Sequence, residues 1–302
     1  MKKAPILGAI AVFFAASLWA FDGALFRPFL LELDITVVVL LEHLIAFAIM
    51  SPFFMWEIKE TRKLDGTDWL ALIFIAVFGG AVGSLAITKA LFMVNFENLS
   101  AIIILQKLQP LFAIFLAYII LKERPKKSFY PWAGVAIIGS YFITFGFQQP
   151  QFDSNSIFFA ALLSLLAAFS FGSSTVFGKK IVKKINFRMA TYLRFGLTTI
   201  IMLVIVSILG RLPEVGTVET PHLLLLFLIA FTTGGTAIFI YYWGLNRIMA
   251  SKATIFELGL PITAVALDYF IHGQIMGPGQ WLGAILIITS ISIITRQAAE
   301  KN

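Results

Sequence analysis

The sequence predicts an all-α membrane protein in which ten transmembrane helices form two inverted five-helix repeats. The chain of 302 residues is 59% hydrophobic and only 13% charged, whereas a soluble domain carries about 25% charged residues. Its apolar residues gather in ten runs, each near the ~20 residues that a helix needs to cross a bilayer. The second half of the chain also repeats motifs of the first. Together these features predict a multi-pass membrane protein with an internal duplication.

The predicted spans follow one another with short connections. They cover residues 5–26, 33–56, 68–93, 98–121, 129–147, 156–177, 188–210, 221–246, 253–271 and 278–295. The opening stretch, MKKAPILGAIAVFFAASLWA, has the charged start, apolar centre and small residues of a secretory signal peptide. Because nine more apolar runs follow it, we interpret this stretch as the first span.

Basic residues predict which ends of the spans face the cytoplasm. The chain contains 23 Lys and Arg. If the N-terminus is cytoplasmic, only Arg27 and Arg211 fall on the opposite side, Lys89, Lys107 and Arg194 lie within spans, and all others are cytoplasmic. Cytoplasmic loops of membrane proteins are enriched in Lys and Arg. Both termini are therefore expected in the cytoplasm, with the protein in the cell (inner) membrane. The net charge of +7 then favours anionic lipid over nucleic acid as the neighbour.

The two halves of the chain share motifs in the same order. Leu105–Pro125 (LQKLQPLFAIFLAYIILKERP) matches Phe256–Met276 (FELGLPITAVALDYFIHGQIM), with their prolines aligned. Each half contributes five spans, which is an odd number, so the halves must enter the membrane with opposite orientation. We expect the repeats to cover residues 1–148 and 149–302. Inverted repeats of this kind are common in transporters, with the site at the interface between the halves.

Four motifs resemble a known family. They are the region around Trp19, Tyr192–Gly196 (YLRFG), Tyr241–Val265 (YYWGLNRIMASKATIFELGLPITAV) and the LKERP that ends the fourth span. With these motifs the chain resembles the ten-helix, EamA-domain transporters of the drug/metabolite transporter (DMT) superfamily. The resemblance implies transport of small organic metabolites, with amino acids as the leading class and export as the commoner direction. It also implies that the spans carrying Trp19 and Phe171 line the cavity.

Several function classes lack the residues that they need. The chain has no Cys and only three scattered His, so neither a metal site, a cofactor nor a thiol nucleophile is expected. It has no Gly-x-x-x-x-Gly-Lys-Ser/Thr loop, which argues against an ATP-driven pump built on this chain alone. An enzyme would need a paired nucleophile and base, and the short loops offer no place for them. An enzyme is therefore not expected.

The glycine clusters FGGAVG and TTGGT favour close helix packing.

The ninth span carries a polar stripe on one helical face. Steps of three and four residues connect Thr254, Glu257, Pro261, Ala264 and Asp268. The equivalent face of the fourth span includes Gln106. Proline deprives a carbonyl one turn earlier of its donor, and such faces are tolerated where they meet protein or a wet cavity. A charge there costs about 2.5–3.5 kcal/mol. We therefore expect Glu257 to line the interior and to be protonated or paired.

Few charged residues can partner Glu257 inside the membrane. Arg194 is expected at a similar depth to Glu257, and Glu42, with His43 beside it, at the depth of Lys107. Each of the two pairs could form a gate at one mouth, contact substrate, or remain a static structural pair. A protonation switch at Glu257 or Glu42 is a further alternative.

Aromatic residues supply the other candidate contacts. Trp19 and its repeat equivalent Phe171 lie on the spans that the family uses for its cavity, and Tyr241 and Tyr242 end the eighth span. An aromatic pocket beside carboxylates suits an organic cation or amine, and equally an amino acid with an apolar side chain. The alternative for the tyrosines is a belt at the membrane interface.

These features predict a secondary active transporter that moves a small organic metabolite, such as an amino acid or amine, by alternating access. It could be proton-coupled. The main alternative is a flippase for a lipid or lipid-linked headgroup, which would need a groove open to the side; a channel is a further one. The fifth and tenth spans carry almost no internal polarity, so we place them at the periphery. The expected partners are a small-molecule substrate and the lipid bilayer, with the chain as a monomer or homodimer.

Overall fold

The computed structural model describes residues 3–94, 105–149, 155–273 and 275–299, and all elements within these ranges are helices. Short 3-10 or π-helical segments carry the letter η. The first half contains α1 (Lys3–Phe21), η1 (Asp22–Phe26), η2 (Arg27–Leu30), α2 (Ile35–Phe54), η3 (Met55–Lys63), α3 (Gly66–Phe74), η4 (Ile75–Val82), α4 (Gly83–Met93), α6 (Gln109–Ile120) and α7 (Phe129–Phe145). The second half contains α8 (Asn155–Val182), α9 (Phe187–Ile208), α10 (Leu212–Val215), α11 (Thr220–Ile229), η5 (Ala230–Gly234), α12 (Gly235–Leu245), α13 (Ala250–Phe256), α14 (Gly259–His272) and α15 (Pro278–Ala299).

Each of the ten predicted spans corresponds to an apolar helix. Within the described residues, eight helical stretches are long and apolar enough to cross a membrane: Ala4–Leu30, Ile35–Lys63, Gly66–Met93, Ser156–Val182, Phe187–Ile208, Thr220–Leu245, Ala250–Ile271 and Pro278–Gln297. The shorter apolar helices α6 and α7 occupy the fourth and fifth predicted spans. Residues 98–104 of the predicted fourth span lie outside the described residues. A helix satisfies its own backbone groups, which an apolar environment requires, and this explains the all-α fold.

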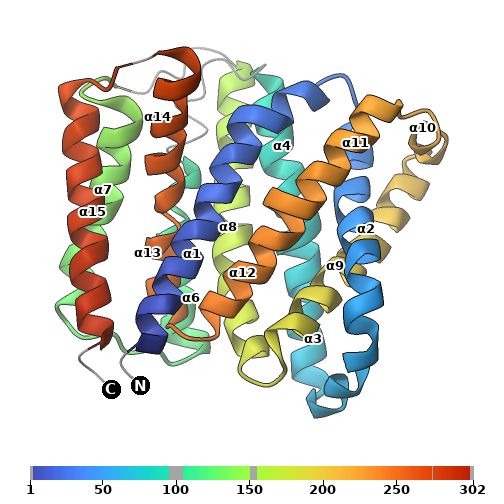
Figure 1. Ribbon diagram of the computed structural model, residues 1–302, viewed down its shortest axis with the longest axis horizontal. Coiled ribbons are helices and arrows are strands. Elements are labelled where there is room, and N and C mark those ends of the chain that lie inside the picture. Colours follow the sequence, from blue (N-terminus) through green and yellow to red (C-terminus); the bar gives the residue numbers. More distant parts are fainter. Residues whose placement is uncertain (1–2, 95–104, 150–154, 274, 300–302) are drawn as a thin grey trace.

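The two halves run in opposite directions, and the first helix of each half packs against the other half. In Figure 1 both termini lie at the lower end, and α1 runs away from that end while α8 runs towards it. The first helix of each half packs against the third and fourth spans of the other half: α1 contacts α12 and α14, and α8 contacts α4 and α6. The second helices, α2 and α9, also pack together. The interface between the halves therefore runs through the centre of the molecule.

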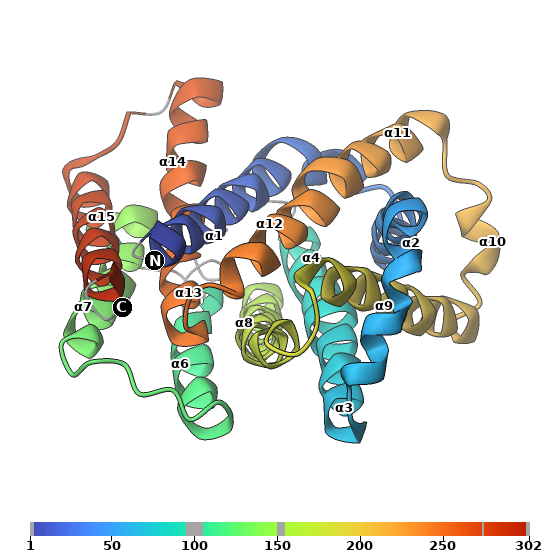
Figure 2. The same cartoon turned by 60° about the horizontal axis from the view of Figure 1, so that its bottom comes forward.

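The fifth and tenth spans form a separate pair at one edge. Figures 1 and 2 show α7 and α15 side by side, on the far side of the molecule from α2 and α9. A Cβ on Gly283 of α15 would lie 2.1 Å from the backbone nitrogen of Ile143 in α7, so this glycine permits the close packing of the pair. The peripheral position that we predicted for these two spans is confirmed.

The third and eighth spans each contain a π-helical segment at their glycine clusters. η4 and η5 interrupt these spans at equivalent places in the two halves. A Cβ on Gly79 would lie 2.1 Å from Oγ of Ser174, and a Cβ on Gly80 would lie 2.1 Å from Oγ1 of Thr198. Only glycine therefore allows η4 to approach α8 and α9 this closely. This geometry supports the packing interpretation of the FGGAVG cluster.

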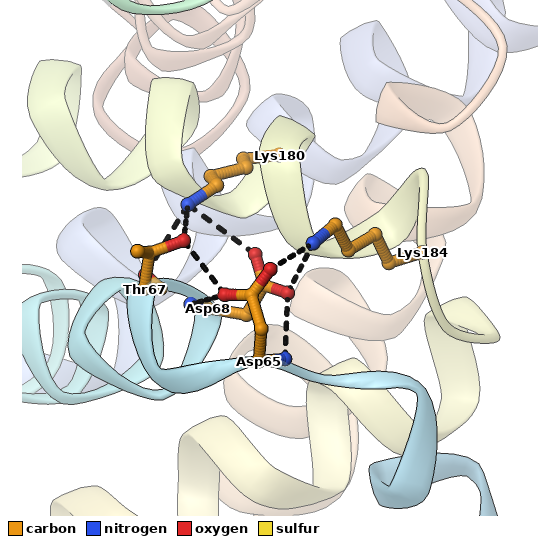
Figure 3. Close-up of polar contacts among 5 residues, drawn as sticks. All are labelled: Asp65, Thr67, Asp68, Lys180 and Lys184. Atoms are coloured by element: carbon orange, nitrogen blue, oxygen red, sulfur yellow. Dashed lines mark hydrogen bonds and ion pairs between the residues drawn. The ribbon is translucent and has the colours of Figure 1, made fainter.

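A cluster of ion pairs joins the beginning of α3 to the end of α8 (Figure 3). Asp65 and Asp68 form a capping box at the start of α3. The Asp68 carboxylate is fully buried and accepts from Lys184 at 2.5 Å, and it pairs with Lys180 at 3.2 Å. Lys184 also reaches Asp65 at 2.8 Å, and Lys180 donates to Oγ1 of Thr67 at 3.0 Å. The cluster fixes the two halves to each other at the end that carries the termini.

We predict that Asp68→Asn destabilises the protein by about 1–3 kcal/mol, because two lysines lose a buried charged acceptor. Thermal unfolding of the purified protein in detergent measures the change. Glu60→Gln is the matched control, since it removes one carboxylate from an exposed pair with Lys63 on the same side of the protein. Equal melting temperatures for Asp68→Asn and the control would show that the cluster contributes nothing to stability.

The Asp65–Lys184 pair should make stability depend on pH at both extremes. The hydrogen bond from Lys184 holds the pKa of Asp65 well below its usual range, and hydrogen bonds to Asp65 and Asp68 raise the pKa of Lys184. The carboxylate's contribution is complete above about pH 4 and declines as the pH falls towards its folded-state pKa; that of the lysine is complete below about pH 10 and declines at higher pH. The melting-temperature difference between wild type and Asp65→Asn should therefore be constant from about pH 5 to 9 and shrink below pH 4. A difference that grows on acidification would contradict this assignment.

Candidate functional site

Two helix breaks face the interior at equivalent positions of the repeats. In the fourth span, Lys107 and Leu108 form a turn before α6, and in the ninth span Glu257 and Leu258 form a turn between α13 and α14. The backbone nitrogen of Leu108 bonds to the carbonyl of Leu105 at 3.1 Å, and that of Leu258 bonds to Ile255 at 3.1 Å, so both turns close over three residues. A proline follows each break within three residues. Proline lacks the N–H that a continuous helix would need, which explains why both spans break at this register.

Glu257 is the centre of a polar cluster formed by three spans besides its own. Tyr241 of α12 donates to Oε1 of Glu257 at 2.6 Å, Thr175 of α8 donates to the same oxygen at 3.4 Å, and the side-chain amide of Gln109 in α6 donates to Oε2. The hydroxyls of Thr175 and Tyr241 are also 2.7 Å apart. We call Glu257, Gln109, Tyr241 and Thr175 the central polar cluster. It joins residues from both halves.

The carboxylate of the central polar cluster is less completely buried than its chain neighbours. Phe256 and Leu258, on either side of it, are 0% and 2% exposed. Glu257 itself is half-buried, as is Gln109. Because Glu257 bonds to side chains of three other spans, it points between helices and not towards the outer surface of the bundle. The prediction that the polar face of the ninth span lines the interior therefore agrees with the position of Glu257; the side chain of Asp268 lies outside the described residues.

Lys107 occupies the break opposite Glu257. Its side chain is buried and interacts electrostatically with the Glu257 carboxylate. No direct ion pair joins the two among the described side chains. Gln106, which we aligned with Glu257, is half-buried, but the amide that bonds to Glu257 belongs to Gln109. The sequence argument missed Gln109 because it assumed a continuous helix, and the break at residues 107–108 changes which side chains share a face.

Aromatic rings line one side of the central polar cluster. Trp19 of α1 is half-buried, and its ring centroid lies 5.4 Å from that of Tyr241. The Tyr241 and Tyr242 rings are 6.0 Å apart, and both residues are almost completely buried. The interface-belt alternative for these tyrosines is therefore wrong. Phe171 of α8 lies close to α4, where a Cβ on Gly83 would be 2.8 Å from its ring.

Arg194 binds the backbone of η4 and does not form the predicted pair with Glu257. Its guanidinium donates to the carbonyl oxygen of Gly79 at 2.9 Å, and at 3.4 Å to the hydroxyls of Ser174 and Tyr242. Its Nε is buried without a hydrogen-bond partner among the described residues. The π-helical segment offers a carbonyl there, which sequence spacing could not reveal. Arg194 is connected to the central polar cluster through Tyr242, whose ring packs beside that of Tyr241.

Glu42 pairs with Arg27 instead of Lys107. Arg27 bridges Asp22 at 2.7 Å and Glu42 at 3.0 Å, and it donates to the hydroxyl of Thr88 at 3.0 Å. We call these four residues the outer ion cluster, because Asp22 and Arg27 belong to η1 and η2, which follow the end of α1 that lies away from the termini (Figure 1). The sequence argument placed Arg27 in a loop. The short helix η2 returns it to the bundle, so that it forms ion pairs with two carboxylates at once.

His43 lies between the outer ion cluster and Arg194. Its Nδ1 is 2.8 Å from the carbonyl oxygen of Val39, and its ring packs 5.4 Å from that of Phe195. Both Arg27 and Arg194 are close enough to act on it electrostatically. Within the described residues no group of three His, Cys, Asp or Glu side chains is placed to hold a metal ion.

The connection between α12 and α13 is held at both of its ends. The Glu123 carboxylate accepts from the backbone nitrogens of Ala250 and Ser251 at 2.8 and 3.0 Å, and from the Ser251 hydroxyl at 2.7 Å. Lys179 donates to the carbonyl oxygens of Leu245 and Asn246 at 2.7 and 3.0 Å. Acidic groups at helix N-termini and basic groups at C-termini satisfy backbone groups that a helix leaves open. We call Glu123 and Lys179, with these four partners, the inner closure.

The inner closure was not predicted from sequence. Glu123 entered only as part of the LKERP motif, and Lys179 only as one of many basic residues near a loop. Glu123 is separated from Ala250 by 127 residues and Lys179 from Leu245 by 66. The contacts follow from the packing of α6 against α13 and of α8 against α12, which no local pattern specifies.

Comparison with known proteins gives a consistent result in both halves. The model of the EamA-like transporter family matches residues 6–145 and again residues 158–296. A solved structure, titled only as the crystal structure of a protein, aligns with 100% of this chain and 99% of its own at a TM-score of 0.76. Its sequence identity is 14%, so this likeness concerns the fold alone.

Curated relatives are also named as transporters. The chain is 44% identical over 293 residues to the "Riboflavin transporter ImpX" of Fusobacterium nucleatum subsp. nucleatum, covering 96% of this chain and 98% of that protein. Two uncharacterized transporters of Bacillus subtilis, YwfM and YoaV, are 26% and 29% identical over 62% of this chain, and the matches cover 60% and 63% of them. With two helical repeats that each match the family, this chain belongs to the EamA-like transporter family and is a multi-pass protein of the bacterial inner membrane.

Proposed function

We propose that this chain is a secondary active transporter of riboflavin, or of a flavin closely related to it. The observation that carries the proposal is the 44% identity, along nearly the full length of both chains, to a protein named as a riboflavin transporter. The chemical groups of the central polar cluster also suit a flavin. A flavin combines a flat heteroaromatic ring with a polyhydroxyl chain, and the site combines Trp19 and Tyr241 with hydroxyl, amide and carboxylate groups.

We further propose that transport proceeds by alternating access around the central polar cluster, with the termini on the cytoplasmic side. The cluster contains residues of both halves, so a rocking motion between the halves would change which side it faces. The inner closure lies between Glu257 and the end that carries the termini, because α13 connects it to the break. We assign it as the contact that must separate when the site opens to that side. Glu257 is the group that we propose exchanges a proton if transport is proton-coupled.

The flippase alternative needs a lateral groove with groups for a charged headgroup. The lateral pocket between α2 and the eighth span has a volume of about 280 Å³. It is lined by Ala46, Ile49, Met50, Phe53, Phe54, Ala230, Phe231, Thr236 and Phe239. This lining contains a single hydroxyl and no charged side chain, so it suits an acyl chain better than a headgroup. The pocket does not favour a flippase.

We predict that Glu257→Gln reduces riboflavin transport about tenfold or more, because it removes a charged acceptor from three hydrogen bonds. Uptake and efflux of radiolabelled riboflavin in proteoliposomes, with and without a pH gradient, measure the rate, the direction and the coupling. Glu60→Gln is the control, since it neutralises an exposed carboxylate far from the cluster in a pair with Lys63.

The same vesicles decide between substrate classes. Amino acids and amines, the classes expected from the family resemblance, are tested as competitors of riboflavin and as labelled substrates. Transport of an amino acid without transport of riboflavin would overturn the proposal. Undiminished transport of riboflavin by Glu257→Gln would show that Glu257 does not belong to the site. Net movement of riboflavin outward would support the expectation of export.

We predict that Glu123→Gln makes the interior more accessible from the side of the termini. Thr254 lies fully buried on α13, between the inner closure and Glu257. Because the chain has no cysteine, Thr254→Cys provides a single reporter for a membrane-impermeant maleimide. Modification in inside-out vesicles should be several-fold faster when Glu123→Gln is added, since one carboxylate oxygen can no longer accept an N–H. Glu60→Gln is again the control, and equal rates would show that Glu123 does not close this side.

A further inference from the structure

We propose that Glu257, together with Gln109 and Lys107 of the facing span, recognises the imide edge of the flavin ring and thereby selects the substrate. This inference rests on the proposed riboflavin transport and assigns the chemistry of that site. It concerns the pyrimidine part of the ring, where two carbonyl groups flank an N–H. That edge presents an acceptor, a donor and an acceptor in a row, so a complementary protein edge needs a donor, an acceptor and a donor.

Glu257 is suited to be the central acceptor. An ionised carboxylate has about four positions for hydrogen bonds. Three donors in the protein, Gln109, Tyr241 and Thr175, use part of this capacity. Glu257 remains half-buried while its neighbours Phe256 and Leu258 are buried, so it keeps accessible surface at which a further hydrogen bond can form. An imide N–H placed there would complete its hydrogen bonding.

The flanking donors come from the opposite half of the protein. The Gln109 amide has two N–H groups, and only one is needed for its bond to Glu257. Lys107, on the facing helix break, has three N–H donors and interacts electrostatically with Glu257. Both belong to the fourth span and Glu257 belongs to the ninth. The two aligned helix breaks therefore bring a carboxylate of one half to an amide donor of the other, with the buried Lys107 on the same break as that donor.

Trp19 supplies the surface on which the ring can stack. It is half-buried and next to Tyr241, whose hydroxyl bonds to Glu257 at 2.6 Å. The aromatic face and the carboxylate are thus connected by one residue. Stacking of a nucleic-acid base on an aromatic side chain is favourable and tolerates different rings. Stacking would therefore hold many flat molecules, and the hydrogen bonds of the imide edge would select among them.

This arrangement implies strong rejection of a ring that lacks the N–H. A site built to bond a substrate N–H or O–H can reject an analogue without it by up to about 10⁴-fold, because a buried polar group is left unpaired. A flavin methylated at N3 keeps the ring, both carbonyls and the polyhydroxyl chain. It loses only the donor that Glu257 would accept. The control for size is an analogue in which ethyl replaces one methyl group on the benzene ring. It also adds one carbon, but at the end of the ring system away from N3.

The experiment measures binding of riboflavin, 3-methylriboflavin and the ethyl analogue to purified protein, through quenching of flavin fluorescence. Wild-type protein should bind 3-methylriboflavin at least 100-fold more weakly than riboflavin, and the ethyl analogue within about tenfold of riboflavin. In Glu257→Ala the preference for riboflavin over 3-methylriboflavin should fall below about tenfold, because the acceptor is gone. Glu60→Gln, which should retain the wild-type preference, is the control for folding and handling.

Failure of the inference and failure of the proposed function give different results. If riboflavin binds and is transported but 3-methylriboflavin binds equally well, the imide assignment is overturned and riboflavin transport stands. Rejection of 3-methylriboflavin that persists undiminished in Glu257→Ala would assign the selection to another residue and also overturn it. If riboflavin neither binds nor is transported, both proposals fall. Should Glu257→Ala not fold, the comparison of the three ligands on wild-type protein still decides.

Discussion

The structure depends on one constraint: inside a bilayer, every polar group must find its partner within the protein. All the described secondary-structure elements are therefore helices, and several interruptions of these helices are matched by a side chain or a tight turn. Arg194 donates to a carbonyl of η4, and Lys179 donates to carbonyls at the end of α12. Glu123 accepts from amide groups at the start of α13. Irregular backbone occurs where a side chain from another span can satisfy it.

The same constraint connects the irregular segments to transport. The two helix breaks lie at equivalent positions of the repeats, and so do the two π-helical segments. Because α1 packs on the second half and α8 on the first, movement of one half against the other must change the surroundings of Glu257 and of Lys107 together. Tight packing at Gly79 and Gly80 makes intermediate arrangements costly, since a packed interface favours discrete states over gradual deformation.

Charge is distributed along the axis of the molecule in three layers. The outer ion cluster neutralises Arg27 with two carboxylates, the central polar cluster holds one carboxylate among neutral donors, and the inner closure and the Asp68 cluster join the halves at the end of the termini. The central layer combines a half-buried carboxylate, Glu257, with the half-buried ring of Trp19. A ligand entering there gains polar and stacking contacts without breaking an ion pair.

The sequence by itself determined the number of spans, the all-α class, the peripheral place of the fifth and tenth helices, and the interior position of Glu257. These properties follow from local composition, because lipid rewards continuous apolar helices and penalises a charge that faces it. Only the tertiary structure decided which charges meet: Glu42 with Arg27 rather than Lys107, Arg194 with Gly79 rather than Glu257, and Gln109 rather than Gln106 with Glu257. The physical reason is that a break in a helix, or a π-helical turn, rotates the residues beyond it relative to those before. Partners separated by more than one hundred residues are then set by packing, which spacing along the chain does not encode.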